Sequence, residues 1–350
     1  EKSFGNFITG RESLTISTKA TITDIENLLV DCLVFYKKRT YKNEFSWVDK
    51  IIEIRNQSLI EILNDNLLSK IKQKDTSVWL AIPEIIDWSD FKGFKYSTRK
   101  SNTLYEDLLV DDFISETAFD NNSSLYDLEK NFVTCWNNDD NIFHKWHLYS
   151  CMNAELKYNN NIYILNNSNW YEIEKDFVSK VNNEFNSTQI SKLNFIDFNH
   201  QDENAYNIAA ANTLNGLCLD ANNLQYGGGN SKIEFCDILT KNKELIHVKM
   251  YAGSSVLSHL FSQGFVSGQL LLNDEIFREK VRNILGAGFK NIIPLKNINS
   301  SDYSIIYGII IDKNKNLNVP FFSKVNFNRF RKNLEAYGFN VYLKKIDNLK

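Results

Sequence analysis

The part of the sequence that most constrains the fold lies in residues 231–263, where two alternating segments are joined by a polar turn and followed by a helical pattern. The alternating positions form two trios: Ile233, Phe235 and Asp237, then Leu245, His247 and Lys249. A period of two places each trio on one face of a β-strand. The polar residues 241–243 predict a turn between the strands. We therefore expect Asp237 to lie near His247 and Lys249, at the sheet edge where a helix begins.

Asp237 and Lys249, if adjacent, could together bind a metal ion and a phosphate. A carboxylate at a strand end, here Asp237, can bind Mg²⁺ through oxygen. A lysine on the adjacent strand, here Lys249, can orient water or stabilise negative charge that develops on a phosphate. The alternative is that the two side chains form a structural ion pair across the hairpin, and the sequence leaves both interpretations open.

The hairpin resembles the catalytic hairpin of the PD-(D/E)XK nuclease superfamily, in which an aspartate strand precedes a strand carrying Glu-x-Lys or Asp-x-Lys. Here the second element reads His247-Val248-Lys249, so histidine stands where the superfamily has a second acid. The resemblance implies a restriction-endonuclease-like fold, nuclease activity and a Mg²⁺ or Mn²⁺ cofactor. It assigns catalytic roles to Asp237, His247 and Lys249.

The resemblance also reaches residues outside the hairpin. It implies that Glu203, on the first core helix, binds the metal together with Asp237. Gln263 resembles a glutamine often found on the helix after the hairpin, and His259 would share its face. Glu234 is a possible substitute carboxylate, although strand parity places it opposite Asp237 unless a bulge intervenes. Glu203 is equally explained as a first-turn carboxylate that stabilises the helix dipole, and His259 as a hydrogen-bonded core residue.

The first half of the chain alternates between strand and helix patterns, which predicts an N-terminal α+β domain over residues 1–190 with a recognition or regulatory role. The predicted strands cover residues 6–17, 45–55, 78–87, 155–158, 162–165 and 170–173. The predicted helices cover residues 21–36, 58–72 and 176–185. The polar stretch 88–141 gives no clear pattern, and residues 187–201 are expected to be a linker.

The second half predicts a mixed sheet with helices on both faces, in a domain over residues 195–350. The expected helices cover residues 203–214, 254–272, 275–285 and 321–337, with further strands at 217–220, 303–311 and 339–346. Residues 227–229 are three glycines and are expected to be a turn. The predicted fold class is therefore α/β with two domains, and the resemblance implies that the second is restriction-endonuclease-like.

Charge, hydropathy and cysteine content indicate which partners and which cellular location to expect. The net charge is −3, but from residue 195 onward 18 Lys and Arg face 14 Asp and Glu, which is compatible with phosphate contact. No apolar run reaches membrane-spanning length and no export signal stands at the start, so no membrane partner is expected. The five scattered cysteines predict reduced thiols and a cytoplasmic location.

The whole chain resembles a sporadically distributed bacterial family of unknown function. The matching segments are FGNFITG, LAIPEIIDW, YILNNSNWYEIEKDFV, IEFCDIL with HVK, LSHLFSQG and VPFFSKVNF. Patchy distribution is typical of mobile defence genes. We therefore expect a metal-dependent nuclease of antiviral defence that acts on nucleic acid, with DNA the expected substrate. The alternatives are a catalytically degenerate nucleic-acid-binding module and a sensor subunit that binds a protein partner, a phage-derived trigger or a second copy of the chain.

Overall fold

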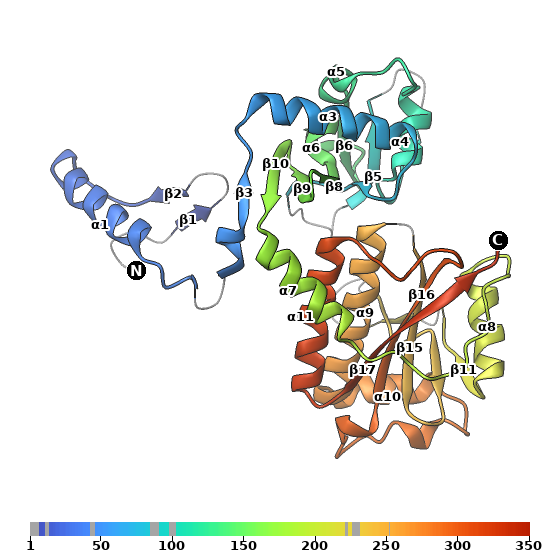
Figure 1. Ribbon diagram of the computed structural model, residues 1–350. Coiled ribbons are helices and arrows are strands. Elements are labelled where there is room, and N and C mark those ends of the chain that lie inside the picture. The colour runs from blue at the N-terminus through green and yellow to red at the C-terminus, as the bar shows by residue number, and fades with distance from the viewer. Residues whose placement is uncertain are drawn as a thin grey trace. The chain divides into compact units, whose positions relative to one another are not determined.

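The computed structural model describes residues 7–10, 14–42, 46–84, 91–97, 103–220, 223–225, 232–251 and 253–350. The last residues of the strand predicted at 78–87 and the glycines at 227–229 lie outside these ranges. The chain divides into two compact units, residues 1–51 and residues 52–350 (Figure 1).

The first unit contains a small hairpin and one helix. Strands β1 (Phe7–Gly10) and β2 (Leu14–Ser17) pair antiparallel, as the sequence predicted. A 3-10 turn, Ile22–Asp24, leads into α1 (Ile25–Lys37). Thr21 and Asp24 form the capping box at the start of this 3-10 turn. The strand predicted over 45–55 is mostly wrong, because Ser46–Lys50 form a 3-10 helix and only β3 (Ile51–Glu53) is extended.

The second unit begins with a five-stranded sheet in the order β3-β10-β9-β8-β4. Its remaining strands are β4 (Val78–Leu80), β8 (Met152–Tyr158), β9 (Asn161–Asn166) and β10 (Asn169–Ile173). The predicted meander of residues 155–173 is confirmed, since β8, β9 and β10 pair in succession. Helix α3 (Gln57–Lys72) packs on this sheet through Leu63, Leu67 and Ile71, which are fully buried.

The stretch 88–141, which showed no clear pattern, contributes a three-stranded sheet and two short helices. The strands are β5 (Phe91–Tyr96), β6 (Phe132–Asn137) and β7 (Ile142–His147), and the helices are α4 (Val110–Thr117) and α5 (Leu125–Lys130). A short helix, α6 (Leu148–Cys151), follows β7. These elements share one hydrophobic cluster with α3 and β8.

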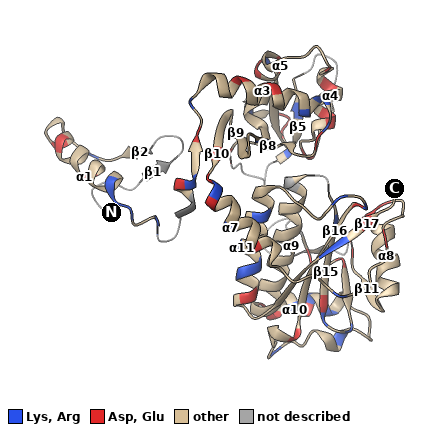
Figure 2. Ribbon diagram, viewed as in Figure 1, with Lys and Arg blue, Asp and Glu red and all other residues tan. Residues whose placement is uncertain are grey.

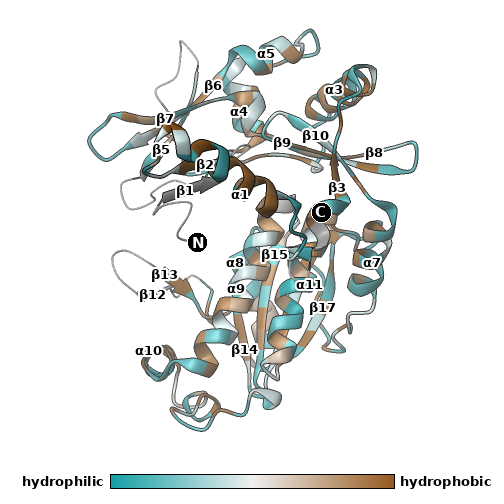
Figure 3. Ribbon diagram, turned by 90° about the vertical axis from the view of Figure 1, so that its left-hand side faces the viewer, coloured by the Kyte–Doolittle hydropathy of each residue, from teal (hydrophilic) through white to brown (hydrophobic). Residues whose placement is uncertain are grey.

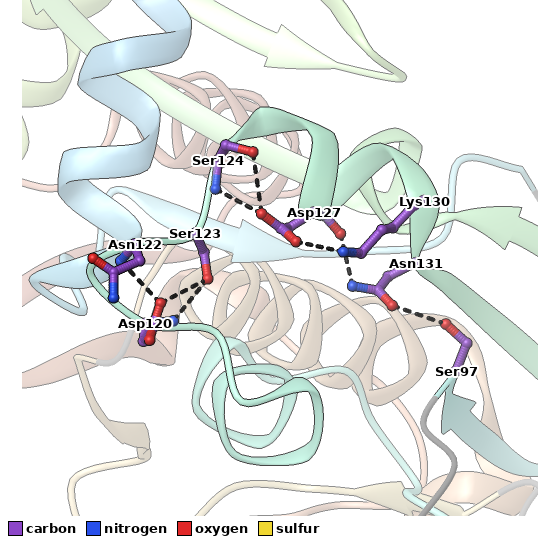
Figure 4. A network of polar contacts seen from close by, with 8 residues as sticks. All are labelled: Ser97, Asp120, Asn122, Ser123, Ser124, Asp127, Lys130 and Asn131. Atoms are coloured by element: carbon purple, nitrogen blue, oxygen red, sulfur yellow. Dashed lines mark hydrogen bonds and ion pairs between the residues drawn. The ribbon is translucent and has the colours of Figure 1, made fainter.

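Local polar contacts explain how a segment with so few apolar residues forms α5. Asp127 accepts hydrogen bonds from the backbone N–H and the hydroxyl of Ser124, which caps the helix start. Lys130 lies 2.7 Å from the Asp127 carboxylate at the other end of the turn. Asn131 donates to the Asp127 carbonyl and accepts from Ser97, which ties α5 to the end of β5 (Figure 4).

The C-terminal part of this unit is a second five-stranded sheet in the order β11-β14-β15-β16-β17. The strands are β11 (Gly216–Cys218), β14 (Ile238–Thr240), β15 (Glu244–Met250), β16 (Ser304–Asp312) and β17 (Asn340–Asn348). β11, β14 and β15 pair antiparallel, whereas β15, β16 and β17 are parallel. A separate pair, β12 (Asn223–Gln225) and β13 (Lys232–Glu234), precedes β14.

Helices cover both faces of this sheet (Figure 1). Helix α8 (Glu203–Thr213) packs on one face through Tyr206, Ala210 and Ala211. The other face contacts α9 (Ser254–Asn273), α10 (Glu275–Ile284) and α11 (Phe321–Ala336) in the largest hydrophobic cluster. The central strands β15 and β16 are largely uncharged, as strands covered on both faces require (Figure 2). The predicted mixed α/β class is confirmed.

Helix α7 (Lys175–Asn186) and the segment after it join the two sheets of this unit. The predicted linker 187–201 is hydrogen-bonded along β17, where Ser191 donates to Leu343 and Phe198 donates to Asp347 through their backbones. One hydrophobic cluster is formed by residues 63–170 and two by residues 185–346, so Phe185, ahead of the boundary predicted at 190–195, packs with the C-terminal part. All five cysteines are free thiols. Within the described ranges, no helix is both long and apolar enough to cross a membrane.

Candidate functional site

Strand β15 provides the frame of the candidate site. It lies between β14 and β16, and its side chains alternate between the two hydrophobic clusters. Leu245 packs on the α9 side, whereas Ile246 and Val248 pack on the α8 side. The predicted pairing of the two strands is confirmed, since Ile238 of β14 is the partner of Ile246. Asp237, immediately before β14, therefore lies beside the second half of β15.

Three carboxylates converge at this point. Asp220, Glu234 and Asp237 each offer an oxygen, and the three oxygens lie within 4.8 Å of one another. Asp237 is buried, with 8% of its surface exposed, and the other two are partly buried. Asp220 follows β11, Glu234 ends β13 and Asp237 precedes β14. The cluster thus gathers the ends of three strands.

The break between β13 and β14 explains why Glu234 and Asp237 can meet. The alternation from Ile233 to Asp237 predicts one continuous strand, on which these two carboxylates would face opposite ways. That expectation is wrong, because residues 235–237 belong to neither strand: β13 pairs with β12, whereas β14 pairs with β11 and β15. Because three residues stand between the two strands, the parity of one strand does not fix the face of the other.

Asp220 was not among the residues that the sequence pointed to. Helix α8 positions it, because Asn204 and Asn207 donate hydrogen bonds to Asp220 Oδ2 at 3.1 and 3.0 Å. Asn207 is 2% exposed, and its own side-chain oxygen has no hydrogen-bond partner within the described part of the chain. The available signal was an acid two residues after a short strand, and that strand pairs with the strand following Asp237.

The charge of the cluster is compensated only in part. Burial raises the pKa of Asp237 well above its usual value, and the neighbouring Glu234 and Asp220 raise it further. The Val248 N–H, which donates to Asp237 Oδ2 at 2.6 Å, and the Lys249 ammonium oppose that rise. An additional positive charge at this point would therefore be stabilised.

Lys249, the cation that the sequence predicted beside Asp237, forms an ion pair with Glu203. Its Nζ lies 3.1 Å from Glu203 Oε1, and its side chain is 38% exposed. Burial lowers its pKa, but the attraction of Glu203, Asp237 and Glu234 outweighs this effect, so the pKa is raised and the amine stays charged. The predicted association of Lys249 with Asp237 is therefore electrostatic, while the ion pair is made with Glu203.

Glu203 occupies the first turn of α8, as expected. Besides the ion pair with Lys249, its second carboxylate oxygen accepts the backbone N–H of Met250 at 2.8 Å. It joins α8 to the end of β15 and is not a member of the carboxylate cluster. Its contacts are those of a residue that holds Lys249 in place.

His247 lies away from the carboxylates. Its ring is 1% exposed and lies against Tyr307 of β16, with ring centroids 6.0 Å apart. Burial lowers its pKa to about 3, and Nε2 has no hydrogen-bond partner within the described ranges. The imidazole is thus neutral at physiological pH and enclosed by the core.

The two supporting residues predicted on α9 differ. Gln263 donates a hydrogen bond to Glu234 Oε2 at 3.1 Å, and Ser267, one turn later, donates to the Glu234 carbonyl. Helix α9 therefore orients Glu234 much as α8 orients Asp220. His259, one turn before Gln263, is exposed on the helix surface.

The donor set fits a hard divalent cation. Carboxylate oxygens are the preferred ligands of Mg²⁺, Mn²⁺ and Ca²⁺, whereas the soft sulfur or imidazole ligands typical of zinc sites are missing from this group. The partial compensation of charge and the unpartnered Asn207 oxygen next to Asp220 agree with that fit. The cluster of Asp220, Glu234 and Asp237 could therefore hold a metal ion.

Comparison with protein families matches this chain over residues 1–347 to a family described as a family of unknown function, DUF6119. The chain belongs to this family. No curated protein and no solved structure matches it. The match spans both compact units and the whole of the candidate site, so the full-length family resemblance seen in the sequence is confirmed.

Proposed function

We propose that this DUF6119 chain is a metal-dependent nuclease that acts on DNA in bacterial antiviral defence. The observation that carries the proposal is the convergence of three carboxylates from three strand ends beside a charged lysine. This arrangement can support phosphodiester hydrolysis, since it offers oxygen ligands for a cation and an ammonium group for the negative charge of the reacting phosphate. The setting in defence rests on analogy with mobile defence genes.

The roles follow from the contacts. Asp220, Glu234 and Asp237 would hold Mg²⁺ or Mn²⁺, which when bound supplies Lewis-acid stabilisation of the phosphate oxygens. Lys249, charged and 38% exposed, is accessible to a phosphate or to an attacking water. The ion pair with Glu203 keeps the Lys249 ammonium group beside the cluster.

Likeness to the PD-(D/E)XK superfamily supports the same activity, with a changed ligand set. The second acid expected on β15 is replaced by His247, which the core encloses. We propose that Glu234 takes the place of that acid. Glu203, assigned to the metal by the resemblance, acts here through Lys249, and His247 has a structural role.

The test is cleavage of plasmid DNA and of RNA by purified protein with Mg²⁺ or Mn²⁺. Asp237→Asn, Asp220→Asn and Lys249→Ala should each reduce cleavage by roughly a hundredfold or more. Asn at position 237 can still accept the Val248 N–H, so folding is preserved. Asp302→Asn, at an exposed acid paired with Lys243, is the matched control. Equal cleavage by all five proteins would identify a contaminant and reject the assignment. Salt-sensitive DNA binding without cleavage would favour the degenerate binding module.

A second candidate function, that of a partner-binding subunit, is favoured by α1. None of its residues is buried, and several large apolar side chains are exposed: Ile25, Leu29, Val30, Leu33 and Val34. Figure 3 shows the helix as largely hydrophobic. Exposed apolar patches of this kind mark interaction surfaces. If α1 mediates self-association, Leu29→Lys should lower the mass measured by light scattering, and an unchanged mass would remove this role.

A further inference from the structure

A second site, unrelated to the carboxylate cluster, lies elsewhere in residues 52–350. A pocket of about 700 Å³ opens where β8, α7 and the N-terminal end of α11 meet. This volume is in the range of small-molecule sites. None of the cluster residues lines it, but Tyr251 does, two residues after Lys249 in the chain.

A buried lysine lines this pocket. Lys324 of α11 is 8% exposed, and its Nζ donates to the side-chain oxygens of Asn182 and Asn318, each at 2.8 Å. Both partners are neutral, and no carboxylate in the described ranges lies within ion-pair distance of this ammonium group. Its burial lowers its pKa, which records the cost of desolvating the charge. An anion in the pocket would offset that cost.

The other charged groups of the lining do not cancel the positive charge. Lys70 and Asp75 pair with each other at 2.8 Å. Lys157 of β8 is exposed at the rim, and Glu155 of the same strand is partly buried. This leaves Lys157 and Lys324 against Glu155 alone.

Glu155 is only partly ionised near neutral pH, so it compensates less of the positive charge of the two lysines. Its carboxylate accepts the backbone N–H of Phe321 in the first turn of α11. Burial nevertheless raises its pKa to about 7, against the opposing effects of that N–H and of Lys324 and Lys157. An anion bound beside it would favour the protonated acid, so binding should take up a proton.

The uncharged lining is rich in groups that recognise a base and a sugar. Asn186 and Asn316 add amides to those of Asn182 and Asn318, and Ser77 and Thr76 add hydroxyls. Tyr251, which hydrogen-bonds to Thr76, adds an aromatic ring. Inorganic phosphate would use only a small part of this volume.

We propose that this pocket binds a nucleoside phosphate, with the phosphates on Lys157 and Lys324 and the nucleoside among the asparagines and Tyr251. The proposal is independent of the nuclease assignment, because it shares no residue with the metal cluster. A ligand here would contact the chain directly after β15 and would also bridge β8 and α11.

The test is calorimetric titration of the full chain in EDTA with the four ribonucleoside triphosphates, adenosine and inorganic phosphate. EDTA removes divalent cations, so the result does not depend on the metal site. At least one triphosphate should bind at least about tenfold more tightly than adenosine or phosphate, since only a nucleotide uses both the lysines and the uncharged groups of the pocket. No binding by any triphosphate would overturn the proposal. Phosphate binding as tightly as the nucleotides would reduce the pocket to a simple anion site and overturn it too.

Variants locate the binding. Lys157→Ala changes an exposed side chain and should weaken binding about tenfold without affecting the melting temperature. Lys324→Met should weaken it as much, although it also perturbs the core. Lys296→Ala, at an exposed lysine outside the pocket, is the control. Affinity should rise as pH falls from 8 to 6 in wild type and change less in Glu155→Gln. If Lys157→Ala bound like the control, the assignment to this pocket would be wrong.

Discussion

Folding shifts the pKa values of two residues in this protein in opposite directions: that of His247 is lowered and that of Glu155 is raised. His247 is held neutral by the core, whereas Glu155 is pushed toward its protonated form in the pocket. Neither shift can be read from the alternating pattern of β15 or β8, because a pattern gives the face of a residue but not the depth of its burial. The two residues therefore predict opposite pH dependences of stability.

His247→Leu should reduce the acid sensitivity of the protein. The folded pKa of about 3 lies below the unfolded value of 6.5. The stability that the buried neutral imidazole contributes is therefore present above pH 6.5 and is lost as the pH falls toward 3. Between pH 7 and pH 5 wild type should lose about 2 kcal/mol more unfolding free energy than the variant. Urea unfolding at both pH values measures this, and His259→Leu, at an exposed histidine, should behave as wild type. Parallel curves for wild type and His247→Leu would contradict the burial of the ring.

Glu155→Gln should act in the other direction. The folded pKa of about 7 lies above the unfolded value of 4.5, so the stability that the protonated acid contributes is present below pH 4.5 and is lost as the pH rises through 7. From pH 5 to pH 8 wild type should lose about 2 kcal/mol relative to the variant, whose amide oxygen can still accept the Phe321 N–H. The same unfolding series measures it, with exposed Glu279→Gln as the control. A variant less stable than wild type at pH 8 would refute the assigned cause.

At the scale of elements, the packing of α9 on β16 fixes the side chains that support the cluster. Gln263 and Ser267 reach Glu234 only because the helix lies close to the sheet at Gly264. A methyl group at Gly264 would come within 2.7 Å of the Tyr307 ring, which is itself held by Phe261 and Phe327. A glycine inside a helix is thus explained by contact rather than by flexibility.

Gly264→Ala should destabilise the protein by about 1–3 kcal/mol, since overpacking exceeds the gain in helix propensity. Among the described residues other than its chain neighbours, no heavy atom lies within 4 Å of a methyl group at Gly286, so Gly286→Ala should be nearly neutral. Thermal unfolding of the two variants compares them. Equal melting temperatures would mean that α9 is free to move away from β16.

Most elements were predictable from pattern, and the exceptions have physical causes. Helices α3, α7, α8, α10 and α11 begin and end within about two residues of the predicted positions, because their apolar spacing and caps are local properties. Strands β13 and β14 were merged into one, because each has its own pairing partner, and partners distant in sequence leave no local signal. For the same reason Asp220 was missed while Asp237 was not.

At the scale of the whole molecule, α7 connects the two sheets of residues 52–350 and packs on α11. Phe185 contacts Phe327 at 5.4 Å between ring centroids, Asn328 donates to the Val181 carbonyl, and Lys332 pairs with Glu184. The domain predicted over 195–350 excludes this helix. A fragment cut there would expose the apolar surface of α11 that α7 covers.

We therefore expect residues 174–350 to form a more stable fragment than residues 195–350. Loss of the Phe185 contact alone removes a buried aromatic side chain, worth about 3 kcal/mol by comparison with aromatic truncations in cores. Expression of both fragments and comparison of their thermal unfolding measures the difference. Equal stability would support a domain boundary at 190–195.

The sequence alone determined the α/β class, the position of most helices and the pairing of the strands around Asp237. It also pointed to Lys249 as a cation beside Asp237. These features were accessible because periodicity, caps and turns act over a few residues. The tertiary structure alone decided that Asp220 and Glu234 join Asp237, that Glu203 binds Lys249 and that His247 is enclosed. Those facts depend on which distant strand pairs with which, and on how closely a helix lies on a sheet. Contacts between residues far apart in the chain leave no trace in local pattern.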